Sequence, residues 1–136
     1  MLLVDTSAWI ELLRKPARLQ LEDIGDLDEV VTCLPVVQEV LQGIREEPAF
    51  RKASSAMWAF PIVESPLSRG VVEGAVDLYR SARRAGITVR SSVDCLIAAC
   101  AVRHGLTVVH VDRDFASLAH VAPLEQRRLR PRPRRR

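Results

Sequence analysis

The sequence predicts an α/β domain with three layers, α/β/α, around a mainly parallel central sheet of four or five strands. Short apolar runs alternate with helical patterns along the chain, which is typical of parallel α/β folds. The first run, Leu2–Val4, has no polar alternation and therefore suits a strand that is covered on both faces. A chain of 136 residues, 48% of them hydrophobic, has the size and apolar content of one domain.

The N-terminal half predicts alternating strands and helices after Leu2–Val4. A first helix starts beside Thr6 and Ser7, which can cap it, and ends at Arg14-Lys15-Pro16, because Pro disfavours helical conformation in its predecessor. Pro35 suits the first turn of a later helix. The other helices of this half are expected at 17–24, 36–45 and 49–59, and strands at 30–34 and 61–63.

The C-terminal half predicts the centre of the fold. A long helix over 67–86 ends at a glycine, and the following helix over 93–104 is apolar nearly all round, which is typical of a central helix. A strong strand is expected over 106–111, followed by a short helix that opens at Asp112-Arg-Asp-Phe115. Residues 121–124 are expected to add an edge strand.

The net charge of +3 comes from the C-terminus. The last twelve residues hold seven arginines and one glutamate, so residues 1–124 carry 13 basic and 16 acidic side chains. A segment rich in Arg and Pro cannot bury apolar area, so we expect the domain to span 1–124 and the tail, 125–136, to be disordered. Two interpretations of the tail stay open: attraction of polyanions without sequence selectivity, and an incidental terminus.

The apolar runs and the cysteines indicate the cellular compartment of the protein. Charged residues or Pro interrupt every apolar stretch, so neither a membrane span nor a secretory segment is expected. Cys33, Cys95 and Cys100 form an odd set without a CxxC pair, which favours reduced, buried thiols in a cytoplasmic protein.

Four carboxylates stand in apolar surroundings. Asp5 ends the first strand, Glu39 lies in an apolar helix, Asp94 lies in the first turn of the most apolar helix, and Asp112 ends the last strong strand. A buried carboxylate costs several kcal/mol unless it is paired or binds a cation, and no Lys or Arg is consistently close in sequence. For Asp5 the competing explanation is a helix N-cap.

These acids would meet if the strands before Asp5 and Asp112 are parallel neighbours, and the helix that starts near residue 93 could bring Asp94 to the same edge. Clustered carboxylates repel one another, so they hold a proton or recruit hard cations. Oxygen ligands without a His or Cys cluster favour Mg²⁺ or Mn²⁺ over Zn²⁺. The chemistry that such a site supports is phosphodiester hydrolysis.

At these residues the chain resembles the PIN-domain ribonucleases, in particular the VapC-type toxins of bacterial toxin–antitoxin pairs. The segments that carry the resemblance are Leu3-Val-Asp-Thr-Ser-Ala-Trp-Ile10, Pro35-Val-Val-Gln-Glu-Val-Leu-Gln-Gly43, Val93-Asp-Cys-Leu-Ile-Ala-Ala-Cys100 and Val108-Val-His-Val-Asp-Arg-Asp-Phe115. Each segment is a weak signal alone, whereas four segments in this order and at this spacing are specific. The resemblance as a whole covers essentially residues 1–124.

The resemblance implies the site residues. The acidic, catalytic quartet is Asp5, Glu39, Asp94 and Asp112, and the metal ligands are Asp5, Asp94 and Asp112. The hydroxyl of Thr6 or Ser7 is an auxiliary group that orients the first acid. Asp114 is a further auxiliary candidate, with a competing role as an acid in the first turn of a helix.

The resemblance also implies activity and partners. It implies a Mg²⁺- or Mn²⁺-dependent endoribonuclease that acts on structured RNA such as tRNA, forms a homodimer and is inhibited by a cognate VapB-type antitoxin. The arginine tail has no counterpart in the general pattern of the family.

Four arginines are candidates for RNA binding. Arg80, Arg83 and Arg84 share one side of a helix and could hold phosphates, although a solvated helix face explains them equally well. Arg90 is nearer to the quartet in sequence and is the stronger candidate.

Two other functions compete with the nuclease. A phosphatase of the haloacid-dehalogenase type would use Asp5 as a nucleophile, but such enzymes place a second Asp where Ser7 stands. A non-enzymatic regulator would bind nucleic acid through the basic tail. DNA is the competing substrate for a nuclease, since a metal site handles the phosphates of either nucleic acid.

Overall fold

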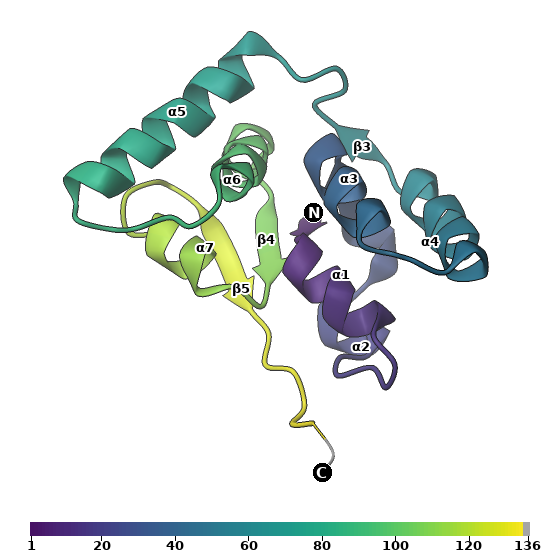
Figure 1. Ribbon diagram of the computed structural model, residues 1–136. Helices are drawn as coiled ribbons and strands as arrows, with labels where there is room; N and C mark the ends of the chain where they lie inside the picture. The colour runs from purple at the N-terminus through teal and green to yellow at the C-terminus, as the bar shows by residue number, and fades with distance from the viewer. Residues whose placement is uncertain (135–136) are drawn as a thin grey trace.

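Five strands form one fully parallel sheet in the order β3-β2-β1-β4-β5 in the computed structural model, which describes residues 1–134 (Figure 1). The strands are β1 (Leu2–Val4), β2 (Val30–Cys33), β3 (Ile62–Val63), β4 (Thr107–His110) and β5 (Glu125–Arg128). The predicted parallel sheet is confirmed, and the last two residues of the predicted tail lie outside the described residues.

Helices connect these strands and pack in two groups. They are α1 (Thr6–Leu13), α2 (Leu21–Ile24), α3 (Leu34–Gln42), α4 (Glu47–Ala59), α5 (Arg69–Arg84), α6 (Ser92–His104) and α7 (Arg113–Leu118), with a 3₁₀ turn at Leu27–Glu29. α3 packs against α1 and α4, α6 packs along α5 and against α7, and α3 and α6 also touch. The two groups of helices and the sheet give the predicted three-layer α/β/α arrangement (Figure 1).

The core lies between the central strands and the helices. Leu3 and Val4 of β1 and Val108 and Val109 of β4 are fully buried, as expected for strands covered on both faces. α6 is buried along most of its length, which confirms the prediction of a central helix. Its end at Gly105 requires the left-handed conformation, with φ of 64°, that glycine adopts without steric cost.

The last strand lies later in the chain than the sequence predicts. We expected an edge strand at 121–124 and a disordered tail from 125, but β5 occupies Glu125–Arg128 and pairs with all four residues of β4. The prediction of disorder is therefore wrong for these residues. An edge strand is held by backbone hydrogen bonds and has one open side, so it accepts charged side chains that hydrophobic patterning does not identify.

Some helix boundaries also differ. The helix predicted over 17–24 is confined to Leu21–Ile24, and the helix predicted to reach residue 45 ends at Gln42 before Gly43. The long helix predicted over 67–86 is Arg69–Arg84, with the Ser68 hydroxyl accepting from the amide of Val71 as its cap. Within the described residues, no helix has the length and apolar content to cross a membrane.

Candidate functional site

The site forms where β1 and β4 end side by side. The two strands are parallel neighbours in register, and the Asp5 amide donates to the Val109 carbonyl at 2.9 Å. Asp5 and Asp112 therefore follow neighbouring strands at one edge, as expected. The chain turns from β1 towards β2 on one side and reaches β4 on the other, and such a switch point is where open α/β sheets place ligands.

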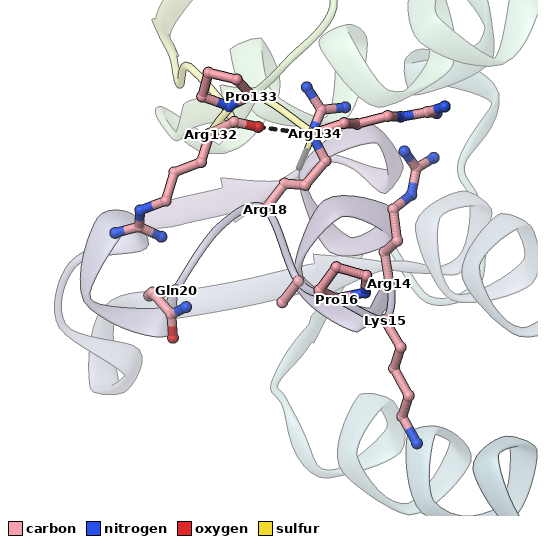
Figure 2. Close-up of a pocket in the computed structure, with 9 residues that line it drawn as sticks. Arg14, Lys15, Pro16, Arg18, Gln20, Arg132, Pro133 and Arg134 are labelled. Atoms are coloured by element: carbon pink, nitrogen blue, oxygen red, sulfur yellow. Dashed lines mark hydrogen bonds between the residues drawn. The ribbon is translucent and has the colours of Figure 1, made fainter. Parts of the chain in front are cut away.

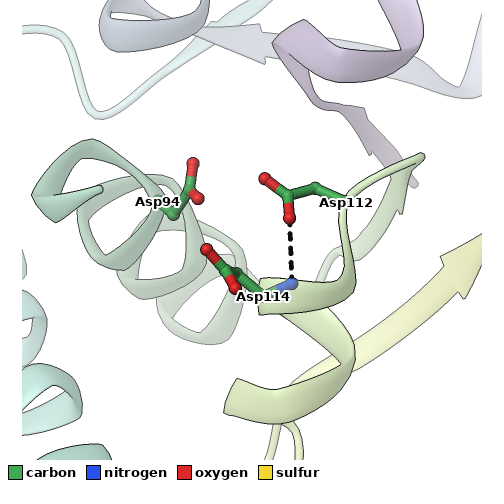
Figure 3. A group of neighbouring side chains, drawn as sticks. All are labelled: Asp94, Asp112 and Asp114. Atoms are coloured by element: carbon green, nitrogen blue, oxygen red, sulfur yellow. Dashed lines mark hydrogen bonds between the residues drawn. The ribbon is translucent and has the colours of Figure 1, made fainter. Parts of the chain in front are cut away.

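Three carboxylates converge at this edge. Asp94 in the first turn of α6, Asp112 before α7 and Asp114 in the first turn of α7 each offer an oxygen, and these oxygens lie within 4.8 Å of one another. Figure 3 shows the three side chains directed towards a common space. Asp94 and Asp114 are buried and Asp112 is half-buried. Such a set of oxygen donors is suited to a hard divalent cation.

These three carboxylates are not the same set as the metal ligands that the resemblance implies. The group contains Asp114, which is only an auxiliary candidate there, and it does not contain Asp5. The Asp112 carboxylate caps α7 by accepting from the amide of Asp114 at 3.0 Å, and this turn directs the Asp114 side chain towards α6. The sequence signal for Asp114 is the pair of acids, two residues apart, after the strand. The sequence analysis explains the second of these acids equally well by the preference for negative charge at a helix N-terminus.

Arg90 partly neutralises the cluster. Its guanidinium donates to Asp112 Oδ1 at 3.0 Å and to Asp114 Oδ2 at 3.3 Å, and its backbone amide also faces Asp114 Oδ2. Arg90 was predicted to be the candidate arginine nearest to the quartet, and the loop before α6 brings it to Asp112, which lies 22 residues further along the chain. Both acids raise the pKa of Arg90, which keeps it charged.

Burial and the neighbouring acids disfavour the charged form of Asp94. Burial is the first cause that raises its pKa to about 8, and the charges of Asp5, Asp112, Asp114 and Glu39 follow. The N-terminus of α6 favours a negative charge there, but this effect is smaller than burial among four other acids. At neutral pH the Asp94 carboxyl is therefore largely protonated unless a cation is added to the site.

Asp5 is both a helix cap and an incompletely paired acid. Its Oδ2 accepts from the amide of Ser7 at 3.0 Å, which is the N-cap role that competed with a catalytic one. Its Oδ1 is buried, and no donor among the described residues reaches it. Burial is also the main cause that raises the pKa of Asp5. An orphaned, buried carboxylate oxygen beside the cluster supports a cation-binding role.

The hydroxyl groups of Thr6 and Ser7 form hydrogen bonds that hold Glu39 and the end of β4 in place. Thr6 donates to Glu39 Oε1 at 2.9 Å, which joins α1 to α3, and the Ser7 hydroxyl accepts from the Val111 amide at 2.9 Å, which joins α1 to the end of β4. Both auxiliary residues therefore lie at the site, each with a different task. Glu39 itself is half-buried on the α3 side of the cluster.

One supporting residue escaped the sequence analysis. His110, at the end of β4, is fully buried; its Nδ1 accepts from the amide of Asp112 at 3.1 Å, and its Nε2 donates to Gln126 Oε1 at 2.6 Å. This arrangement requires the neutral ring, and burial lowers the pKa of His110 accordingly. β5 thereby helps to position Asp112. A histidine at the last position of the strand, two residues before Asp112, was the available signal.

The three arginines of α5 are not brought to the cluster. Arg80, Arg83 and Arg84 are exposed, and within residues 1–134 no hydrogen bond or ion pair joins them to the acids. Arg90 is the only one of the four candidate RNA-binding arginines with a described contact to the cluster.

Comparison with known proteins agrees with this fold. The PIN domain family matches residues 2–121. Ribonuclease VapC11 of Mycobacterium tuberculosis is 35% identical, over 92% of this chain and 96% of its own length. The solved toxin–antitoxin complex from Klebsiella pneumoniae contains a chain that is 25% identical, with a TM-score of 0.68, over 92% of this chain and 99% of that one. VapBC-5 of Mycobacterium tuberculosis has the same fold, with a TM-score of 0.69, 22% identity and coverage of 93% and 97%.

The chain belongs to the PIN domain family. Its similarity to curated VapC ribonucleases extends over nearly the whole chain, so within that family it is a toxin endoribonuclease of the VapC type.

Proposed function

We propose that this toxin hydrolyses phosphodiester bonds of structured RNA, with tRNA as the substrate class, in a reaction that requires Mg²⁺ or Mn²⁺. The observation that carries the proposal is the convergence of the Asp94, Asp112 and Asp114 oxygens within 4.8 Å, in a chain similar to named ribonucleases. The unpaired Asp5 oxygen beside them adds a fourth acceptor.

The donor set fits a hard cation. All the candidate ligands are carboxylates, and within the described residues the metal-capable group contains neither Cys nor His. We assign Asp94, Asp112 and Asp114 as the residues that would hold the ion, with Asp5 alongside. A divalent cation there supplies charge for the phosphate oxygens and makes water a better nucleophile at neutral pH.

The chain's own residues then orient the reaction. Glu39 has Oε1 fixed by Thr6, which leaves Oε2 to accept a hydrogen bond from the attacking water. The Arg90 guanidinium remains 58% exposed while it contacts Asp112 and Asp114, so it can donate to a phosphate oxygen that enters the site. Asp94 and Asp114 are buried, so this side of the cluster is shielded from bulk water. When water attacks phosphorus and the P–O3′ bond breaks, the 3′ oxygen leaves as a hydroxyl and the products carry 5′-phosphate and 3′-hydroxyl ends.

Cleavage of total bacterial tRNA tests the proposal. Wild-type protein should cut in Mg²⁺ and not in excess chelator, and Asp94→Asn should lower the rate by at least about a hundredfold, as expected when a group that stabilises the transition state is lost. Asp77→Asn, an exposed carboxylate of α5, is the matched control and should retain the wild-type rate. Undiminished cleavage in chelator would contradict the requirement for metal.

A cognate VapB-type antitoxin is the proposed inhibitor, and a groove between α1 and α3 supports it. Ile10, Leu13, Val40 and Ile44 line a cavity of about 280 Å³ that has Glu39 in its wall. Ile10 and Leu13 are 45% and 46% exposed, so an apolar partner segment would cover them. A basic side chain of that segment would meet Glu39 and the cluster beyond. Ile10→Asp should weaken the antitoxin complex more than RNA cleavage.

A homodimer is proposed through α5. Val72, Val76 and Tyr79 form an exposed apolar stripe on this helix, at helical spacing, beside an apolar cavity of about 380 Å³ against α6. Burial of this stripe against a second copy would remove it from water. Light scattering at micromolar concentration should give twice the mass of the chain, and a monomer would contradict the assignment.

A further inference from the structure

The C-terminal arginine segment docks onto the folded domain. The Arg132 amide donates to the Arg18 carbonyl at 2.9 Å, and Arg18 Nε donates back to the Arg132 carbonyl at 2.8 Å. Arg132 Nη1 also lies 3.8 Å from Asp23 of α2. The main chain after β5 is therefore fixed against the loop between α1 and α2, although its side chains remain exposed.

A basic cavity of about 720 Å³ results from this docking, with walls from residues 14–18, 20 and 132–134. Arg14, Arg18 and Arg134 direct their guanidinium groups to the same side of it, whereas Lys15 points away (Figure 2). Glu11 is the shared partner of two of them, at 3.6 Å from Arg14 and 3.5 Å from Arg18. Among the described residues, no carboxylate lies within ion-pair distance of Arg134. Two of these three cations share one carboxylate and the third has no such partner among the described residues, so the excess positive charge favours an anionic ligand.

This basic cavity continues towards the acidic cluster. Glu11, the ion-pair partner of Arg14 and Arg18, lines a second cavity of about 560 Å³. The wall of this second cavity also contains Arg90, Arg113, Arg128 and Asp112. The two cavities are therefore linked by the ion pairs between Glu11 of the second and Arg14 and Arg18 of the first. The second cavity has Asp112 of the cluster in its own wall.

We propose that the two cavities form one binding track for the phosphate backbone of the RNA substrate, with the docked tail as its outer end. The inference rests on the proposed nuclease function and adds to it the path of the substrate. RNA fits the geometry because it carries a phosphate on every nucleotide, so a strand cleaved at the cluster presents further phosphates along the track. Cations away from the cluster also offset the repulsion between the acids and the substrate.

Salt-dependent binding tests the track without cleavage. Fluorescence anisotropy of a labelled RNA stem–loop, with full-length protein in chelator and increasing NaCl, reports the number of phosphate contacts. Arg14→Gln with Arg134→Gln should reduce the slope of log affinity against log salt by about 1.5, since each lost contact removes about 0.7 to 0.9. Arg51→Gln with Arg69→Gln, two exposed arginines that also pair with a carboxylate on their own helix and line neither cavity, should leave the slope unchanged.

The outcomes separate this inference from the proposed function. Arg134→Gln alone has no described ion pair to lose, so it should reduce the slope by about 0.7 to 0.9 even if the double variant folds poorly. Equal slopes for wild type, this variant and the control would overturn the track. If the arginine variants lost affinity for duplex DNA but kept their affinity for the RNA stem–loop, this result would also overturn the track. If the variants reduce the slope as predicted but the wild type does not cleave the bound RNA in Mg²⁺, only the proposed nuclease chemistry is contradicted.

Discussion

Replacing Asp94 by Asn should stabilise the metal-free protein. The folded chain holds the pKa of this carboxyl at about 8, against an ordinary value of 3.8, because burial and neighbouring acids disfavour its charge. A raised carboxyl pKa stabilises the fold fully below the ordinary value, and this contribution is lost as pH rises towards 8. Asn has nearly the same shape and no charge, so the variant avoids that loss.

The size of the effect follows from the pKa. Linkage between pKa values of 3.8 and about 8 gives a ceiling of about 4 kcal/mol in the free energy of unfolding at pH 7. At pH 5 the same relation gives a ceiling of about 2 kcal/mol. Relaxation and water penetration reduce these values, so we expect about 2 kcal/mol at pH 7, which corresponds to about 5–10 °C in melting temperature.

Calorimetric melting in chelator measures this gain. The melting temperature of Asp94→Asn should exceed that of wild type at pH 7, and the difference should grow from pH 5 to pH 8. Asp77→Asn, which removes an exposed acid of α5, should melt like wild type at every pH. A variant that melts at or below the wild-type temperature across this range would refute the electrostatic reasoning about the cluster.

The remaining predictions concern the cation, the acids and the dimer. Mg²⁺ or Mn²⁺ should raise the melting temperature of wild type by mass action, and Asp5→Asn with Asp94→Asn should abolish that shift in fluorimetry; a retained shift would place the ion elsewhere. Asp114→Ala should reduce RNA cleavage as strongly as Asp112→Ala, because the carboxylate oxygens of both residues face the same space. A near-normal cleavage rate for Asp114→Ala would exclude Asp114 from the catalytic site. Val76→Asp should convert a dimer into a monomer in light scattering, since a charge would enter the apolar stripe, and an unchanged mass would exclude α5 from the interface.

The sequence was sufficient to predict the position of most of the site. An apolar strand that ends on an acid, as at Asp5 and Asp112, identifies the carboxyl edge of a parallel sheet, because neighbouring strand ends share that edge. The apolar character of α6 predicted its central place, and hence the burial of Asp94.

Other parts depend on geometry that local patterns do not encode. Asp114 joins the cluster because Asp112 caps α7 and sets the direction of its first turn. Arg90 reaches both acids through a loop separated from them by 22 and 24 residues. β5 has no hydrophobic alternation, since backbone pairing with β4 holds it, and so composition favoured disorder there.

Mapping the ends of the RNA products tests the central claim most directly. Total RNA is incubated with the protein and Mg²⁺, and the new termini are identified by their chemistry. Hydrolysis by water at the carboxylate cluster predicts 5′-phosphate and 3′-hydroxyl ends, formed only with the divalent cation and absent with Asp94→Asn. Products with 2′,3′-cyclic phosphate ends, or the same ends formed in chelator, would contradict it.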